Sequence, residues 1–248
     1  MNRRGTLAAL AGLAVLAVAV SKSWAEQPLQ EIVEGFGRHA TLAQQRQFAE
    51  ALAASPALAR QLTAAAEAGR LVAIDVVPAQ SLPNKPFLAT IDRGRILFVP
   101  DFLDRVATRR LSGIVQRDDI LPNNLVFVLG CLVSQLQGPA VPPTTDMQIF
   151  IQANIARDAR AFIQGWNDVV DAAERENGDR YLSAPQQLSL LENLRYRSVF
   201  LDRAGRRIVP WTSSGAIDPT DQIVATLVEA LRHSNLLDFG VPPDLSVR

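Results

Sequence analysis

The sequence predicts an α+β protein that is mainly helical, with one small sheet of about three strands. Apolar residues recur at helical spacing over most of the chain. Only 71–99 contains the short apolar runs with β-branched residues that are typical of strands. The 248 residues, 48% of them apolar, suffice for one packed domain. We therefore expect a leader at 1–25 and a single domain at 26–248, with helical parts at 28–69 and 100–238 around the sheet.

The leader has the pattern of a secretory signal peptide. Two arginines near the start precede Leu7–Val20, an uncharged run rich in Leu, Ala and Val. Lys22 ends this run before the roughly 20 apolar residues that a membrane span needs. Ser23 and Ala25 are small residues at the −3 and −1 positions of a cleavage site. We expect cleavage after Ala25 and a periplasmic or secreted protein; an uncleaved anchor is the alternative.

Composition excludes several classes of function. The chain has 25 basic and 25 acidic residues, and acidic residues predominate by three from Glu26 onward, so no nucleic-acid partner is expected. One Cys excludes an internal disulfide framework, and with two His it excludes an ordinary zinc site built from those residues. We find no phosphate-binding glycine loop, nucleophile elbow or calcium loop, and we expect no cofactor and no membrane span after cleavage.

Capping residues divide the segment 28–69 into three helices. Thr41 is positioned to cap the second helix, Ser55 and the proline after it begin the third, and Gly69 ends it. His39 falls between the first two helices. We interpret His39 as a solvated or capping residue and not as a metal ligand.

Three short apolar runs predict the sheet. Leu71–Val77 is β-branched, and Phe87–Ile91 and Arg95–Val99 flank a turn at Asp92–Gly94. We expect the last two runs to form a hairpin, with Arg95–Val99 as an edge strand.

Helical spacing returns after Pro100, and five further helices are expected there. They begin near Phe102, after a cap at Asn123 or Asn124, at Thr144, after a cap at Ser183, and at Asp218.

An unusual polar cluster, Gln164–Asp168, interrupts the longest of these helices, 144–177. Gly165 costs roughly 1 kcal/mol relative to Ala in a helix, and such a local inconsistency marks either a site or a close helix crossing. We interpret Gly165 as permitting tight packing, with Trp166 in the core.

The helix that contains the single thiol resembles a known active-site helix. Arg95–Val99 leads through one helix to the apolar segment Asn124–Gln135, an order similar to that of zincin metallopeptidases, in which an apolar stretch precedes a His-Glu-x-x-His motif. On that alignment Cys131 occupies the position of the first His, Leu132 that of the general-base Glu, and Gln135 that of the second His. The resemblance implies a zincin-like fold.

The resemblance also implies a third ligand from a following helix, for which Arg157 or Asp158 is the nearest candidate. A zincin needs both His for the metal and the Glu to take a proton from metal-bound water. Cys131 can ligate zinc as a thiolate, but Gln135 is a poor ligand and Leu132 accepts no proton. A protein of this kind is therefore a pseudoenzyme, with Cys131, Leu132, Gln135 and Asp158 as its degenerate site.

Other interpretations of the segment remain open. It is apolar nearly all round, as a core helix is, and a buried Cys needs no function. A reactive Cys131 would need a nearby base, for which His233 is a candidate. We expect an exported binding protein with a protein or peptide partner. The alternatives are a hydrolase with an altered site around Cys131, Gln135 and Asp158, and a structural component without a site.

Overall fold

The computed structural model describes seven parts of the chain, 27–81, 89–100, 103, 120–139, 144–194, 199–202 and 204–232. The leader and the candidate base His233 lie outside these residues. Of the helix expected near Phe102, only Pro100 and Leu103 are described, and both are helical.

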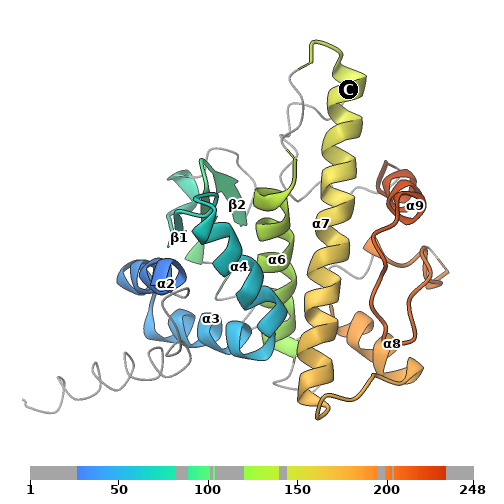
Figure 1. Ribbon diagram of the computed structural model, residues 1–248, viewed down its shortest axis with the longest axis horizontal. Helices are drawn as coiled ribbons and strands as arrows, with labels where there is room; N and C mark the ends of the chain where they lie inside the picture. Colours follow the sequence, from blue (N-terminus) through green and yellow to red (C-terminus); the bar gives the residue numbers. More distant parts are fainter. Residues whose placement is uncertain are drawn as a thin grey trace, which may run out of the picture.

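The described residues form a mainly helical protein with one three-stranded sheet. Figure 1 shows α2, α3, α4 and the sheet on one side of α6, with α7 on its other side and α8 and α9 beyond α7. The helices are α2 (Gln27–His39), α3 (Leu42–Ala54), α4 (Pro56–Glu67), α6 (Ile120–Gln137), α7 (Met147–Glu176), α8 (Ala184–Asn193) and α9 (Asp221–Arg232). The strands are β1 (Ala73–Val76), β2 (Ala89–Asp92) and β3 (Arg95–Phe98).

The second and third helices, α3 and α4, begin where their capping residues predict. The Thr41 side chain accepts a hydrogen bond from the backbone of Gln44, whose side chain binds the Thr41 backbone in return. Ser55 caps α4 by accepting from the Leu58 N–H. Gly69, with φ of 66°, follows the end of α4 in the left-handed conformation that favours glycine.

The sheet has the strand order β1-β3-β2. β2 and β3 form the predicted antiparallel hairpin, and β1 pairs with β3 in parallel. The two-residue turn consists of Arg93 and Gly94, with φ of 49° and 79°, as a tight hairpin requires. The prediction that Arg95–Val99 is an edge strand is wrong. β3 pairs with both β1 and β2, which places it in the centre of the sheet, and Ile96–Phe98 are buried.

The start of α6 also differs from the prediction. The helix begins at Ile120, so Asn123 and Asn124 lie inside it and do not cap it. Pro122 stands in the first turn, where a proline breaks no helical hydrogen bond. A proline in the first turn is therefore compatible with a helix that starts before the asparagines.

The boundaries of the later helices follow their caps. Asp146 caps α7 by accepting from the Gln148 and Ile149 N–H groups, slightly later than the predicted start at Thr144. α9 begins at Asp221 and not at Asp218, because Thr220 supplies the cap, its Oγ1 accepting from Ile223 N at 3.3 Å. No helix among the described residues is both long and apolar enough to cross a membrane.

Candidate functional site

Helix α6 is the centre of the core. It packs against α3 and α4 on one side and along α7 on the other. All residues from Leu125 to Val133 are buried, including Cys131 at 1% and Leu132 at 3% exposure. These two candidate site residues therefore behave as parts of a core helix.

Two glycines let α6 and α7 cross at short range. A Cβ on Gly130 would lie 2.9 Å from Gly165 Cα, and one on Gly165 would lie 2.5 Å from Phe127 O and 2.7 Å from Cys131 Sγ. Real Cβ atoms do not approach so closely. The interpretation of Gly165 as a packing residue is confirmed.

The neighbours of Gly165 attach α7 to the C-terminal part of the chain. Trp166 is fully buried and donates from Nε1 to the Gly215 carbonyl at 2.8 Å. The Asn167 amide donates to Ile217 O at 2.9 Å and accepts from Ile217 N at 2.8 Å. These polar residues therefore hold a neighbouring segment in place, which explains their presence inside the helix.

Gln135 and Asp158 meet at the half-buried end of α6. Gln135 Nε2 donates to Asp158 Oδ1 at 2.9 Å, and Arg157 Nε lies 3.7 Å from the same oxygen. Arg157 and Asp158, the two candidates for the third ligand, thus both lie at this end of the contact between α6 and α7. Cys131 is on α6 one turn before Gln135, so the face that carries the candidate residues is turned toward α7.

Burial dominates the electrostatics of these groups. Burial raises the pKa of Asp158 to about 7, against the charge of Arg157 and the hydrogen bond from Gln135. The pKa of Cys131 is raised well above its usual value, first by burial and then by the charges of Asp168 and Asp158. The thiol is therefore protonated at neutral pH and is a poor nucleophile.

These residues do not fit a zinc ion. Cys131 is a buried neutral thiol, Leu132 is apolar, and the amide nitrogen of Gln135 already donates to Asp158. Within the described ranges, no group of three or more His, Cys, Asp or Glu side chains is placed to hold a metal. We therefore assign no metal chemistry to the site.

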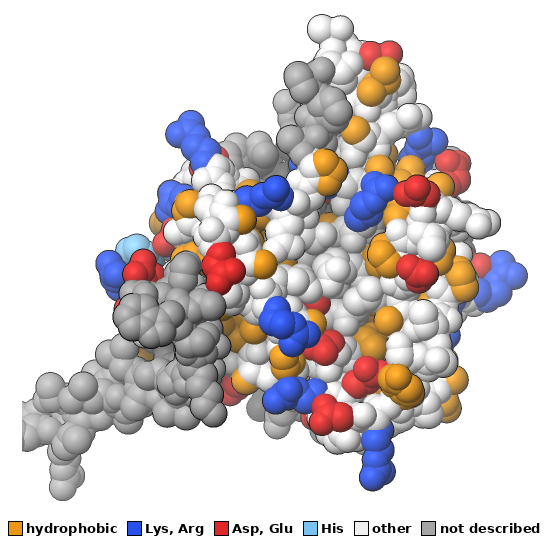
Figure 2. All heavy atoms as spheres, viewed as in Figure 1, with side chains coloured by type: hydrophobic (Ala, Val, Ile, Leu, Met, Phe, Trp, Pro, Cys, Tyr) orange, Lys and Arg blue, Asp and Glu red, His pale blue; other side chains and the backbone are white. Residues whose placement is uncertain are grey.

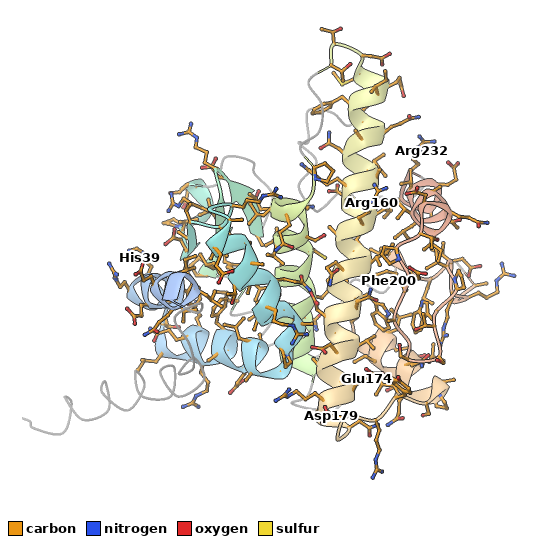
Figure 3. All side chains as sticks on the ribbon, in the orientation of Figure 1. His39, Arg160, Glu174, Asp179, Phe200 and Arg232 are labelled. Atoms are coloured by element: carbon orange, nitrogen blue, oxygen red, sulfur yellow. The ribbon has the colours of Figure 1, made fainter. Side chains whose placement is uncertain are left out.

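His39 lies apart from the candidate site. Figure 3 places it on the outer side of α2, away from α6 and α7. Its side chain is 62% exposed, with Nδ1 3.3 Å from Asp75 Oδ1, and Asp75 also accepts from Arg95. The prediction that His39 is solvated is confirmed.

One buried acid, Asp168, belongs to the polar cluster marked in the sequence but was given no role of its own there. Its side chain is fully buried, and Oδ1 accepts from Gln61 Nε2 at 2.7 Å and Gln164 Nε2 at 3.1 Å. Burial raises its pKa to about 7, although both hydrogen bonds lower it. The sequence signal was an Asp within a polar cluster inside a helix, and its partner Gln61 on α4 is distant in the chain.

Comparisons with protein-family models, curated proteins and solved structures found no match. Figure 2 shows acidic and basic side chains interspersed over the face in view. No single-sign surface on that face indicates a class of ligand.

Proposed function

We propose that this chain is an exported, non-catalytic binding protein on a zincin-like scaffold, with a protein or peptide partner. The proposal rests on one observation, the hydrogen bond between Gln135 and Asp158. These residues occupy the positions at which the resemblance expects the second and third metal ligands. The Gln135 amide N–H faces the Asp158 carboxylate, and an amide nitrogen that donates a hydrogen bond is not a metal ligand.

The neighbouring residues support a loss of catalysis. The base position is held by Leu132, a buried apolar side chain that cannot take a proton from water. The first ligand position is held by Cys131, whose thiol stays protonated because of its burial. Both departures favour a pseudoenzyme over the alternative of a hydrolase with an altered site.

The sheet offers a mode of binding for an extended peptide. β2 is the outer strand of the hairpin and lies beside α6, with β3 as its hydrogen-bonded neighbour in the described sheet. The outer edge of such a strand presents backbone donors and acceptors to a peptide. The leader sequence supports a location in the periplasm or outside the cell.

The scaffold is tested by restoring its ligands. In the mature chain, the double variant Cys131→His/Gln135→His places two imidazoles four residues apart beside Asp158. We expect it to bind one Zn²⁺ per chain, measured by metal analysis after dialysis, at least about tenfold more tightly than the wild type. The same variant with Asp158→Asn is the matched control and should lose most of this gain. A folded double variant with wild-type zinc affinity would contradict the scaffold proposal.

The role of the native chain is tested with β-casein as an unfolded protein probe. The wild type should bind labelled casein, seen as a rise in fluorescence anisotropy, and should leave it uncleaved with or without added Zn²⁺. Cleavage would support the hydrolase alternative. A chain that neither binds nor cleaves casein would favour the structural component.

A further inference from the structure

Two buried acceptor atoms at the contact between α4 and α7 have no hydrogen-bond partner among the described residues. They are Asp168 Oδ2 and Gln61 Oε1. The other polar atoms of the same two side chains are hydrogen-bonded to each other, since Gln61 Nε2 donates to Asp168 Oδ1 at 2.7 Å. An unpaired buried acceptor is costly, and two on one bonded pair of side chains need a common explanation.

A single proton would satisfy both atoms. An ionised carboxylate only accepts hydrogen bonds, so Asp168 Oδ2 and Gln61 Oε1 are both acceptors without a donor. A carboxylic acid carries one O–H donor, and a primary amide has both a donor and an acceptor. The two groups can therefore form a ring of two hydrogen bonds, of which the N–H to Oδ1 bond is already present.

We propose that Asp168 is a carboxylic acid in the folded protein, that its Oδ2–H donates to Gln61 Oε1, and that this acid–amide pair ties α7 to α4 in a pH-dependent way. The proton is taken from solvent on folding and returned to solvent when the pair ionises. This inference is independent of the proposed function, because it involves none of the positions compared with zincin ligands.

Packing around Asp168 excludes other partners for Oδ2. A Cβ on Gly130 would collide with Oδ2, so the backbone of α6 lies directly against the carboxyl group. Gln164, on α7 itself, donates to the oxygen that Gln61 already uses. Within the part of the chain that the structure describes, no neighbour donates to Oδ2, and a proton on Oδ2 supplies the missing donor.

Charged and titratable groups face Asp168 from three helices. Arg60 on α4 lowers its pKa through its charge, and Asp171 on α7 raises it. Cys131 on α6 is a protonated thiol whose own pKa is raised by the charges of Asp168 and Asp158. Because Asp171 opposes Arg60, these charges offer the carboxylate little in place of its lost hydration.

The sign of the pH dependence follows from burial. An unfolded Asp has a pKa of about 3.9, whereas the folded pKa of Asp168 is about 7. The stability from this group is therefore fully present below about pH 4 and is lost as the pH rises to about 7. The contact between α4 and α7 is therefore expected to loosen as the pH rises from about 4 to about 7.

The proposal is tested with Asp168→Asn, whose amide N–H replaces Oδ2–H at every pH. The unfolding constant of each protein is measured in urea at pH 5 and at pH 8. From pH 5 to pH 8, the constant of the wild type should rise about 10- to 100-fold more than that of Asp168→Asn. The exposed variant Asp221→Asn is the control and should follow the wild type. An equal pH dependence in wild type and Asp168→Asn would overturn the proposal.

The pairing itself is tested by exchanging the two groups. Asp168→Asn combined with Gln61→Glu restores an acid and an amide in reversed positions, and it should regain the pH dependence that Asp168→Asn alone has lost. If the stability of this double variant changes with pH as little as that of Asp168→Asn, the pairing is overturned. The infrared difference between wild type and Asp168→Asn at pH 6 should contain a protonated carboxyl band that is lost at pH 9. The subtraction removes the contribution of Asp158, whose pKa is also about 7, and absence of the band from the difference would also overturn the proposal.

Discussion

Helix α7 carries two buried acids, Asp158 and Asp168, that differ in their surroundings. Both are at most 5% exposed, both accept from a glutamine of a neighbouring helix, and burial raises the pKa of each to about 7. Arg157 lies 3.7 Å from Asp158, and its side chain is 28% exposed. At Asp168, the charge of Asp171 raises the pKa and that of Arg60 lowers it, and the carboxyl group lies against the glycine crossing.

The comparison shows that a buried Asp that accepts a hydrogen bond from a Gln can be stabilised in two ways. At the Asp158 end, a nearby cation and the hydrogen bond from Gln135 oppose the effect of burial and stabilise the carboxylate once it ionises, above about pH 7. At the Asp168 end, packed backbone lies against the group, and we infer that a proton satisfies it. Local packing, and not residue identity, therefore decides what stabilises each acid. Three experiments can break or sharpen this contrast.

The largest contrast is expected in thiol accessibility. Cys131 is the only thiol of the chain and lies at the closed end, whereas Gln135 lies at the half-buried end. A thiol reagent should label native Cys131 at least about 100-fold more slowly than a cysteine placed by Gln135→Cys in a Cys131→Ala background. Similar rates in the two folded proteins would show that the interface is not closed at Cys131.

A large loss of stability is expected from a methyl group at the crossing. Gly130→Ala would place a Cβ against Asp168 Oδ2 and Gly165 Cα, and we expect a loss of about 2–3 kcal/mol in the free energy of unfolding. Gly35→Ala is the matched control, because nothing lies within 4 Å of its Cβ in helix α2. It should gain up to about 1 kcal/mol. Equal effects of the two substitutions in urea unfolding would remove the argument for a tight crossing.

The smallest effect is expected at the Asp158 end. Arg157→Met removes the cation that lowers the pKa of Asp158, so this pKa should rise. The loss of stability should be about 1 kcal/mol at pH 8, where the carboxylate is ionised, and smaller at pH 5, where it is protonated. Arg160→Met breaks an ion pair with Asp221, which is 99% exposed, and should change little at either pH. A loss for Arg157→Met that is the same at both pH values would contradict the assigned role of Arg157.

Sequence reasoning succeeded where the deciding interactions are local. Thr41, Ser55 and the Arg93–Gly94 turn act on residues within a few positions, and each is found where predicted. It failed for the place of β3 in the sheet, because strand order depends on pairing with a distant segment. The start of α6 failed for a different reason, since two asparagines gave a stronger cap signal than the proline before them.

The candidate site was predictable in part. A spacing of four residues puts Cys131 and Gln135 on one face of α6, and the contact between Gln135 and Asp158 confirms which helix that face meets. The importance of Asp168 could not be predicted, because Gln61 is 107 residues away and nothing in a single sequence links the two. The sequence marked the polar cluster around Gly165, but only the packing shows which member lacks a partner.

The contacts of Trp166 and Asn167 have a consequence for folding. These two side chains bind the backbone at Gly215 and Ile217, 49 and 50 positions further along, so the outer face of α7 is completed late in synthesis. Figure 3 shows Phe200 on that same side of α7, and its ring is 5.7 Å from that of Trp166. A chain whose synthesis stops before residue 199 would leave this aromatic face open to solvent. Until its last segment is added, α7 is therefore a surface that chaperones and proteases can recognise.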